Sequence, residues 1–164
     1  MMKILLQTTE LLFDIRNKSH MECESITDVD ARYRTEAGAD KIDEVRRCLT
    51  EAVSRLYRLA YRWTRKFYQE ETFDDADIPS ENHHLHYIFE LNLTQRQGEG
   101  KAKMLADLFH EYVVEATLAK FYGSVSAQEL SNIHSTRALD AGERISELLN
   151  RKSVPVSTYD TSNL

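Results

Sequence analysis

The stretch from Asp40 to Tyr68 reads DKIDEVRRCLTEAVSRLYRLAYRWTRKFY and contains neither glycine nor proline. Apolar residues recur in it at alternating steps of three and four, which is the spacing of one face of an α-helix. At 1.5 Å per residue, a helix of this length would extend about 40 Å. The pattern therefore predicts one long central helix over residues 40–68, with apolar positions at Ile42, Val45, Leu49, Ala52, Leu56, Leu59 and Trp63.

Two further helices are predicted in the C-terminal half, over residues 101–122 and 127–150. A first helix is predicted from Thr9 to Lys18, and a shorter one between Thr27 and Gly38. The whole chain of 164 residues has only five glycines and two prolines, which favours long helices. We expect a mainly α bundle forming one domain over residues 1–152, followed by a C-terminal arm over 153–164.

Residues 84–94 show the alternation that is typical of a β-strand with one polar face. The odd-numbered positions are apolar, and they are Leu85, Tyr87, Phe89, Leu91 and Leu93. A single strand needs a partner for its edges, which the N-terminal segment, the C-terminal segment or another subunit could supply. We therefore expect a minor strand or hairpin that docks on a neighbour, together with extended termini.

The region from Arg46 to Lys66 holds seven basic residues and one acid, Glu51. Within it, Arg55, Arg58, Arg62 and Arg65 recur at helical spacing and predict a basic stripe beside the apolar face. Three interpretations remain open at this stage: a contact with nucleic-acid phosphates, a contact with an acidic partner such as the segment Asp74–Asp77, or a solvated face. The net charge of −6 argues against a surface that is basic throughout.

Candidate metal ligands gather at His83, His84 and His86, with Glu81 or Glu90 as a further ligand. A zinc site requires four ligands, and a polar strand face explains these histidines equally well. The spacing of Asp107 and His110 resembles half of a di-metal bundle motif, but a matching pair on another helix is missing. We expect no bound metal and no cofactor.

The chain shows no nucleophile elbow, no phosphate-binding loop and no catalytic Cys–His pattern, so we expect a protein that is not an enzyme. Cys23 and Cys48 are expected to be free thiols. The N-terminus lacks the pattern of a signal peptide, and no apolar run reaches the 20 or so residues that cross a membrane. Synthesis in the cytoplasm without membrane association is the expectation.

Several segments resemble helical proteins from the structural-gene blocks of tailed bacteriophages and of prophages of gut bacteria. The clearest are Leu118–Tyr122, Val125–Asn132, Ala138–Gly142 and Ile145–Leu149, and Asp30–Gly38 is also similar. The resemblance implies a virion neck component of the head–tail connector or ring type, with ring-like self-association and with portal, tail or other neck proteins as partners. Contact with DNA is possible under the same resemblance, and no functional residue is carried over.

Two alternatives from other classes follow from the residues alone. The basic stripe could belong to a small helical DNA- or RNA-binding regulator, whose affinity would fall steeply with salt. Asp107, His110 and the His83–His86 group could belong to a di-metal enzyme, which metal analysis would test.

Overall fold

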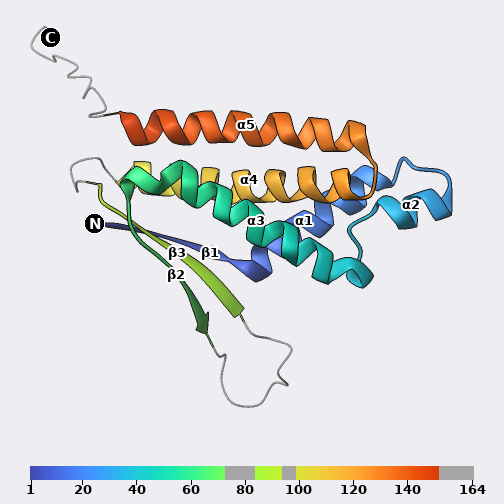
Figure 1. Cartoon of the computed structure of the whole chain (residues 1–164), viewed down its shortest axis with the longest axis horizontal. Coiled ribbons are helices and arrows are strands. Elements are labelled where there is room, and N and C mark those ends of the chain that lie inside the picture. The colour runs from blue at the N-terminus through green and yellow to red at the C-terminus, as the bar shows by residue number, and fades with distance from the viewer. Residues whose placement is uncertain (73–83, 94–98, 152–164) are drawn as a thin grey trace, which may run out of the picture.

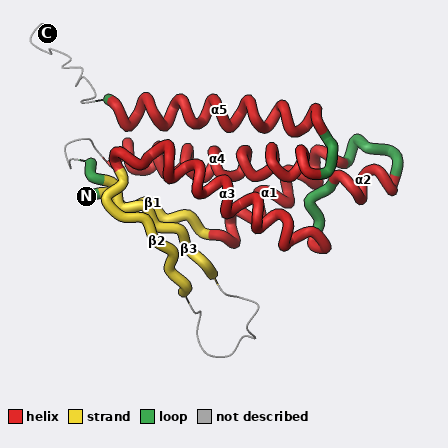
Figure 2. Tube along the Cα trace, viewed as in Figure 1, coloured by secondary structure: helices red, strands yellow, loops and turns green. Residues whose placement is uncertain are grey.

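The computed structural model describes residues 1–72, 84–93 and 99–151, and it is mainly helical with a small antiparallel sheet (Figures 1 and 2). The predicted fold class is thereby confirmed at this level. The predicted C-terminal arm, residues 153–164, lies outside the described residues. In chain order the elements are β1 (Met2–Gln7), α1 (Thr8–Cys23), α2 (Val29–Thr35), η1 (Ala39–Lys41), α3 (Ile42–Ala60), η2 (Tyr61–Trp63), β2 (Thr64–Thr72), β3 (His84–Leu91), α4 (Glu99–Ser124) and α5 (Gln128–Asn150).

Helix α4 occupies the centre of the bundle, with α5 along one side and α3 and α1 on the others (Figure 1). With 26 residues it is also longer than α3, which has 19. The boundaries of α4 and α5 agree with the predicted helices to within two residues at each end. The large side chains of Phe109, Phe121 and Tyr122 on α4 are fully buried, and the ring of Tyr122 lies 5.4 Å from that of His134 on α5.

The predicted long helix over residues 40–68 is wrong in its last third. Helix α3 ends at Ala60, a short 3₁₀ turn follows, and the chain continues as strand β2 from Thr64. The helical spacing misled because a local pattern does not record pairing with a distant strand: Trp63 lies in the 3₁₀ turn, and the residues after it pair with β3. In the strand, Phe67 pairs with Phe89 of β3 and stacks on Tyr57, with ring centroids 4.9 Å apart.

The three strands pair in the order β1–β3–β2, so β3 is the middle strand of the sheet. Both of its edges are occupied within the same chain, by β1 from Met2 to Gln7 and by β2 from Thr64 to Thr72. The strand was correctly predicted, and of the three edge partners left open the N-terminal segment is confirmed, whereas the expectation that the strand docks on a neighbour is wrong. The N-terminal segment satisfies one edge, and a segment expected to be helical satisfies the other.

The apolar parity of β3 faces the helices rather than a neighbouring molecule. Tyr87, Phe89 and Leu91 are buried in the main hydrophobic core, and Leu93, just beyond the strand, is buried with them. The backbone of Leu85 pairs with Glu71 of β2. Tyr87, Phe89, Leu91 and Leu93 therefore belong to the core of this chain, and the interpretation of the strand as a docking element is corrected.

Candidate functional site

The predicted basic stripe is spread over three elements instead of one helix. Arg55 and Arg58 lie on α3, Arg62 lies in the η2 turn, and Arg65 lies on β2. All four side chains are exposed, as are those of Arg46 and Arg47 near the start of α3. The face that these residues form is called the basic face below.

Most of these guanidinium groups lack an acidic neighbour in the described part of the chain. Arg55 is the exception, since its Nη2 lies 2.8 Å from Glu51 Oε1. The other carboxylate oxygen of Glu51, Oε2, lies 3.4 Å from Lys120 Nζ. Within residues 1–72, 84–93 and 99–151, no ion pair is formed by Arg46, Arg47, Arg58, Arg62 or Arg65.

A shallow hollow on α3 adds geometry to this charge. Its lining combines guanidinium groups with two hydroxyls and one carboxylate, from Arg46, Arg47, Thr50, Glu51, Ser54 and Arg58. Thr50 and Ser54 donate their hydroxyl protons to backbone carbonyls one turn earlier, which leaves their oxygens able to accept. The hollow is suited to bind an anionic group, because cationic side chains dominate its walls. The acidic segment Asp74–Asp77, one predicted partner, lies outside the described residues.

The candidate metal ligands are only partly placed. His83 and Glu81 lie outside the described residues, while His84 and His86 are on β3, with His86 opposite Gln7 and Glu70. Glu90, the other candidate ligand, lies 3.3 Å from Lys3 Nζ. Among the described residues, no group of three or more ligand side chains has the arrangement of a metal site.

The second metal candidate is also arranged differently from the prediction. Asp107 is exposed, and His110 Nε2 lies 2.6 Å from Asp14 Oδ2 of α1. This pair joins α1 to α4 near the surface. Glu115, named only as a neighbour of the Asp107–His110 pair, belongs instead to a buried network that sequence reasoning missed.

The network is centred on His134 of α5, which is fully buried. Its Nδ1 contacts Glu115 of α4, and its Nε2 lies 2.9 Å from Glu22 Oε2 of α1. The Tyr122 hydroxyl donates to the same oxygen of Glu22 at 2.8 Å. Lys18 donates to the other oxygen of Glu115, so that cationic and anionic groups alternate along the network.

The pKa values of these groups are shifted in the directions that favour charge. Burial opposes protonation of His134, but the hydrogen bonds that its ring donates to Glu115 and Glu22 outweigh this effect and raise the pKa of the imidazole. Burial also acts to raise the pKa of Glu115, yet its contacts with His134 and Lys18 leave that pKa lowered. Burial also acts to raise the pKa of Glu22, but its hydrogen bonds with His134 and Tyr122 leave that pKa lowered. These three directions are consistent with a protonated His134 imidazole between the ionised carboxylates of Glu115 and Glu22.

The contacts of this network indicate a structural role. Both ring nitrogens of His134 are used, and Glu115 is only 2% exposed, so neither group is presented to a substrate. The three partners come from α1, α4 and α5, which the network fastens together across the bundle. The accessible candidate site is therefore the basic face, whereas the buried network joins α1, α4 and α5, of which α4 packs against α3.

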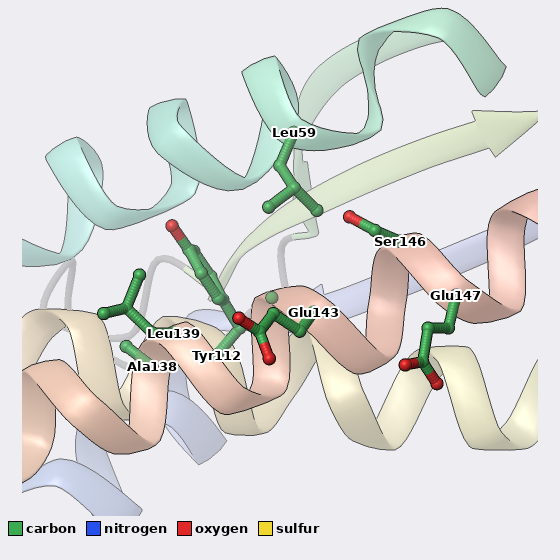
Figure 3. A pocket seen from close by; sticks show the side chains of 8 residues that line it. Leu59, Tyr112, Ala138, Leu139, Glu143, Ser146 and Glu147 are labelled. Carbon is green, nitrogen blue, oxygen red and sulfur yellow. The ribbon is translucent and has the colours of Figure 1, made fainter.

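A groove between α3 and α5 lies beside the basic face (Figure 3). Its floor is apolar, with Leu59 from α3, Tyr112 from α4 and Leu139 from α5. Gly142 lets the helices approach here, because a Cβ at that position would lie 3.3 Å from Leu59 Cδ1.

A scan of protein-family models, a search of curated proteins and a search of solved structures each gave no match to this chain. Within the described residues, no helix combines the length and the apolar character needed to cross a bilayer.

Proposed function

We propose that this protein is a non-catalytic assembly component that binds an acidic surface through the basic face. The observation that carries the proposal is the set of exposed guanidinium groups, at Arg46, Arg47, Arg58, Arg62 and Arg65, with no ion pair among the described residues. Such groups are available to form charge-assisted hydrogen bonds with carboxylates of a partner. The buried His134 network supports the proposal indirectly, since it gives a rigid platform rather than an accessible catalytic group.

The finer assignment is a head–tail connector or ring protein of a virion neck, which would place the protein in the virion after synthesis in the host cytoplasm. Its support is the resemblance of the segments between Leu118 and Leu149 to phage structural proteins. Self-association together with portal, tail or other neck proteins is the mode of action proposed. The pairing of β3 within the chain removes the strand from this proposal, which rests on surface charge instead.

The proposal is tested by mixing the full chain with the portal and tail-completion proteins of a phage or prophage that encodes it. Size-exclusion chromatography with light scattering should then show a complex of defined mass. Replacing Arg58 and Arg62 by Glu should abolish the complex, while the same change at Arg16 and Arg34, which are exposed on α1 and α2, should leave it intact. A wild-type chain that forms no complex with any of these proteins contradicts the neck assignment.

A second candidate function is binding of DNA or RNA by the same face. The hollow that gathers Arg46, Arg47 and Arg58 favours it, because guanidinium groups are frequent phosphate contacts. A gel shift at increasing salt tests it: each phosphate contact should contribute about −0.9 to the slope of log affinity against log salt. Changing Arg58 and Arg62 to Ala should then reduce the slope by about two.

A further inference from the structure

Tyr61 presents an aromatic ring to solvent beside the arginines of the basic face. Its side chain is 63% exposed, and it lies in the η2 turn, where the chain passes from α3 into β2 (Figure 1). Arg58 lies one helical turn earlier, since the Tyr61 backbone N–H donates to the Arg58 carbonyl. Arg62 is the next residue along the chain. The exposed ring is therefore flanked in sequence by two exposed guanidinium groups.

A row of aromatic rings connects Tyr61 to the core. Tyr61 meets Tyr57 edge to face, with ring centroids 5.7 Å apart. Tyr57 stacks on Phe67 of β2 at 4.9 Å, and Phe67 contacts the fully buried Phe89 at 4.7 Å. Because each ring in the row contacts the next, the core positions Tyr61 although its own ring is exposed. A ring held in this way loses little conformational entropy when a flat ligand stacks on it.

The charge around this ring is positive. Residues 52–69 contain no aspartate or glutamate, and their cations are Arg55, Arg58, Arg62, Arg65 and Lys66. Arg65 is the extra residue of a β-bulge at the start of β2, where the pairing with β3 skips from Thr64 to Lys66. Its Nη1 lies 3.8 Å from Met1 Sδ, which carries no charge. Anionic groups of a ligand can therefore approach the ring from the side of these arginines.

The surroundings of Tyr61 differ from those of another exposed tyrosine. Tyr33 of α2 is 64% exposed, and Lys41 Nζ lies 5.4 Å from the centroid of its ring. In the part of the chain that the structure describes, no such cation covers the ring of Tyr61. The nearby guanidinium groups of Arg58 and Arg62 also form no ion pair within residues 1–72, 84–93 and 99–151.

We infer that single-stranded nucleic acid binds the basic face, with one base stacked on Tyr61 and adjacent phosphates on Arg58 and Arg62. Every base has an aromatic face, and a single strand can place that face on a protein ring, whereas duplex bases are already stacked and paired. Guanidinium groups beside the ring supply the phosphate contacts. A carboxylate surface would use the arginines but not the ring. The inference rests on the second candidate function and deepens it by naming the form of the nucleic acid.

Stacking and phosphate contacts respond differently to salt, which allows them to be measured separately. Fluorescence anisotropy of a labelled oligothymidine of about 16 nucleotides, titrated with the full chain at several salt concentrations, gives both affinity and slope. Tyr61→Ala should weaken binding by about 5- to 150-fold and leave the slope of log affinity against log salt unchanged. Arg58→Ala with Arg62→Ala should reduce that slope by about 1.4, since each phosphate contact on a single strand contributes about 0.7.

Two matched variants test whether the aromatic ring itself is responsible. Tyr61→Phe retains the ring and should restore most of the binding that Tyr61→Ala loses. Tyr33→Ala removes an equally exposed tyrosine and should change neither the affinity nor the slope. Circular dichroism should confirm that every variant is folded.

Two further ligands test the form of the nucleic acid. A duplex of the same length should bind the Tyr61→Ala variant as it binds the wild type, because its bases are not available for stacking. Oligouridine is titrated in parallel to compare RNA with DNA, and Tyr61-dependent binding of either strand supports the inference.

A wild-type chain whose dissociation constant for both single strands exceeds about 100 μM at low salt would overturn the inference. So would a folded Tyr61→Ala variant that binds them as tightly as the wild type does. If that variant bound fully while the arginine variant did not, the second candidate function would stand without stacking on Tyr61. If no nucleic acid bound but the complex with portal or tail proteins formed, only the proposal of an acidic protein partner would stand.

Discussion

His134 of α5 contacts Glu115 of α4 through its Nδ1 atom, and both side chains are buried in the middle of the bundle. The second ring nitrogen reaches Glu22 of α1, so one imidazole joins three helices. Because the contact requires a protonated imidazole facing ionised carboxylates, the stability of the fold should depend on pH in two directions.

On the alkaline side, folding raises the pKa of His134, so its contribution is fully present below the ordinary histidine value of about 6.5. That contribution is lost as the pH rises through the raised pKa. Urea unfolding between pH 6 and pH 9 should therefore show a falling free energy of unfolding for the wild type. The variant His134→Gln should be less stable at pH 6 and should show a flatter profile, and a wild-type slope that persists in the variant would contradict this assignment.

On the acid side, the pKa values of Glu115 and Glu22 are lowered by folding. Their contribution is present above the ordinary glutamate value of about 4.3 and is lost as the pH falls through the lowered pKa values. Thermal unfolding from pH 5 down to pH 2 should show a loss of stability that is smaller in a Glu115→Gln variant. Equal losses in the two proteins would show that other carboxylates control acid unfolding.

Removing Glu115 should cost more than removing an exposed partner of the same kind. Glu115→Ala leaves Lys18 and a buried His134 without their shared carboxylate, and we expect a loss of about 3 kcal/mol in the free energy of unfolding. Asp14→Ala breaks the pair with His110 near the surface and should cost less than about 1 kcal/mol. Chemical denaturation of both variants at pH 6 makes the comparison, and similar losses would contradict the structural importance given to the buried network.

Two of the helical glycines, Gly100 and Gly142, should respond differently to substitution. A Cβ at Gly100 meets nothing within 4 Å, so Gly100→Ala should stabilise the fold by about 0.5–1 kcal/mol through helix propensity. At Gly142 the added carbon would lie 3.3 Å from Leu59 and 3.4 Å from Tyr112, so the gain from Ala should be smaller. Gly142→Leu should destabilise by about 1–3 kcal/mol, measured by urea unfolding.

The burial of Phe89 in the sheet can be tested by substitution. Phe89 of the middle strand is fully buried against Phe67 and Phe109, whereas Leu5 of β1 is 48% exposed. Phe89→Ala should lower the free energy of unfolding by about 3–5 kcal/mol, and Leu5→Ala should lower it by less than about 1 kcal/mol. If the two variants were equally stable, β3 could not be the buried centre of the sheet.

The elements that were predicted correctly are those whose local pattern has one explanation. Helix α5 was predicted from repeats that include Ala138, Ala141 and Ile145, all of which are buried. Near its start the apolar Ile133 is 45% exposed, whereas the polar His134 is fully buried. His134 lies four residues before Ala138, so helical spacing alone could have placed it, had polar residues been considered for the core.

The remaining features depend on contacts between distant parts of the chain. Strand β2 exists because its residues pair with β3, a contact that no local spacing in this segment records. The His134 network joins residues 19 and 112 positions away in the sequence, and no local motif marks such an arrangement. The basic residues of the candidate site were identified from sequence, but their distribution over α3, η2 and β2 required the fold.

The strand order also constrains how this protein is made. The middle strand of the sheet is the last of the three to leave the ribosome, and Gln7 of β1 finds its partner only at His86. At typical synthesis rates the nascent N-terminal strand therefore waits on the order of ten seconds for its neighbour. Throughout that interval its apolar side chains, Ile4 and Leu6, are open to chaperones and to other nascent chains.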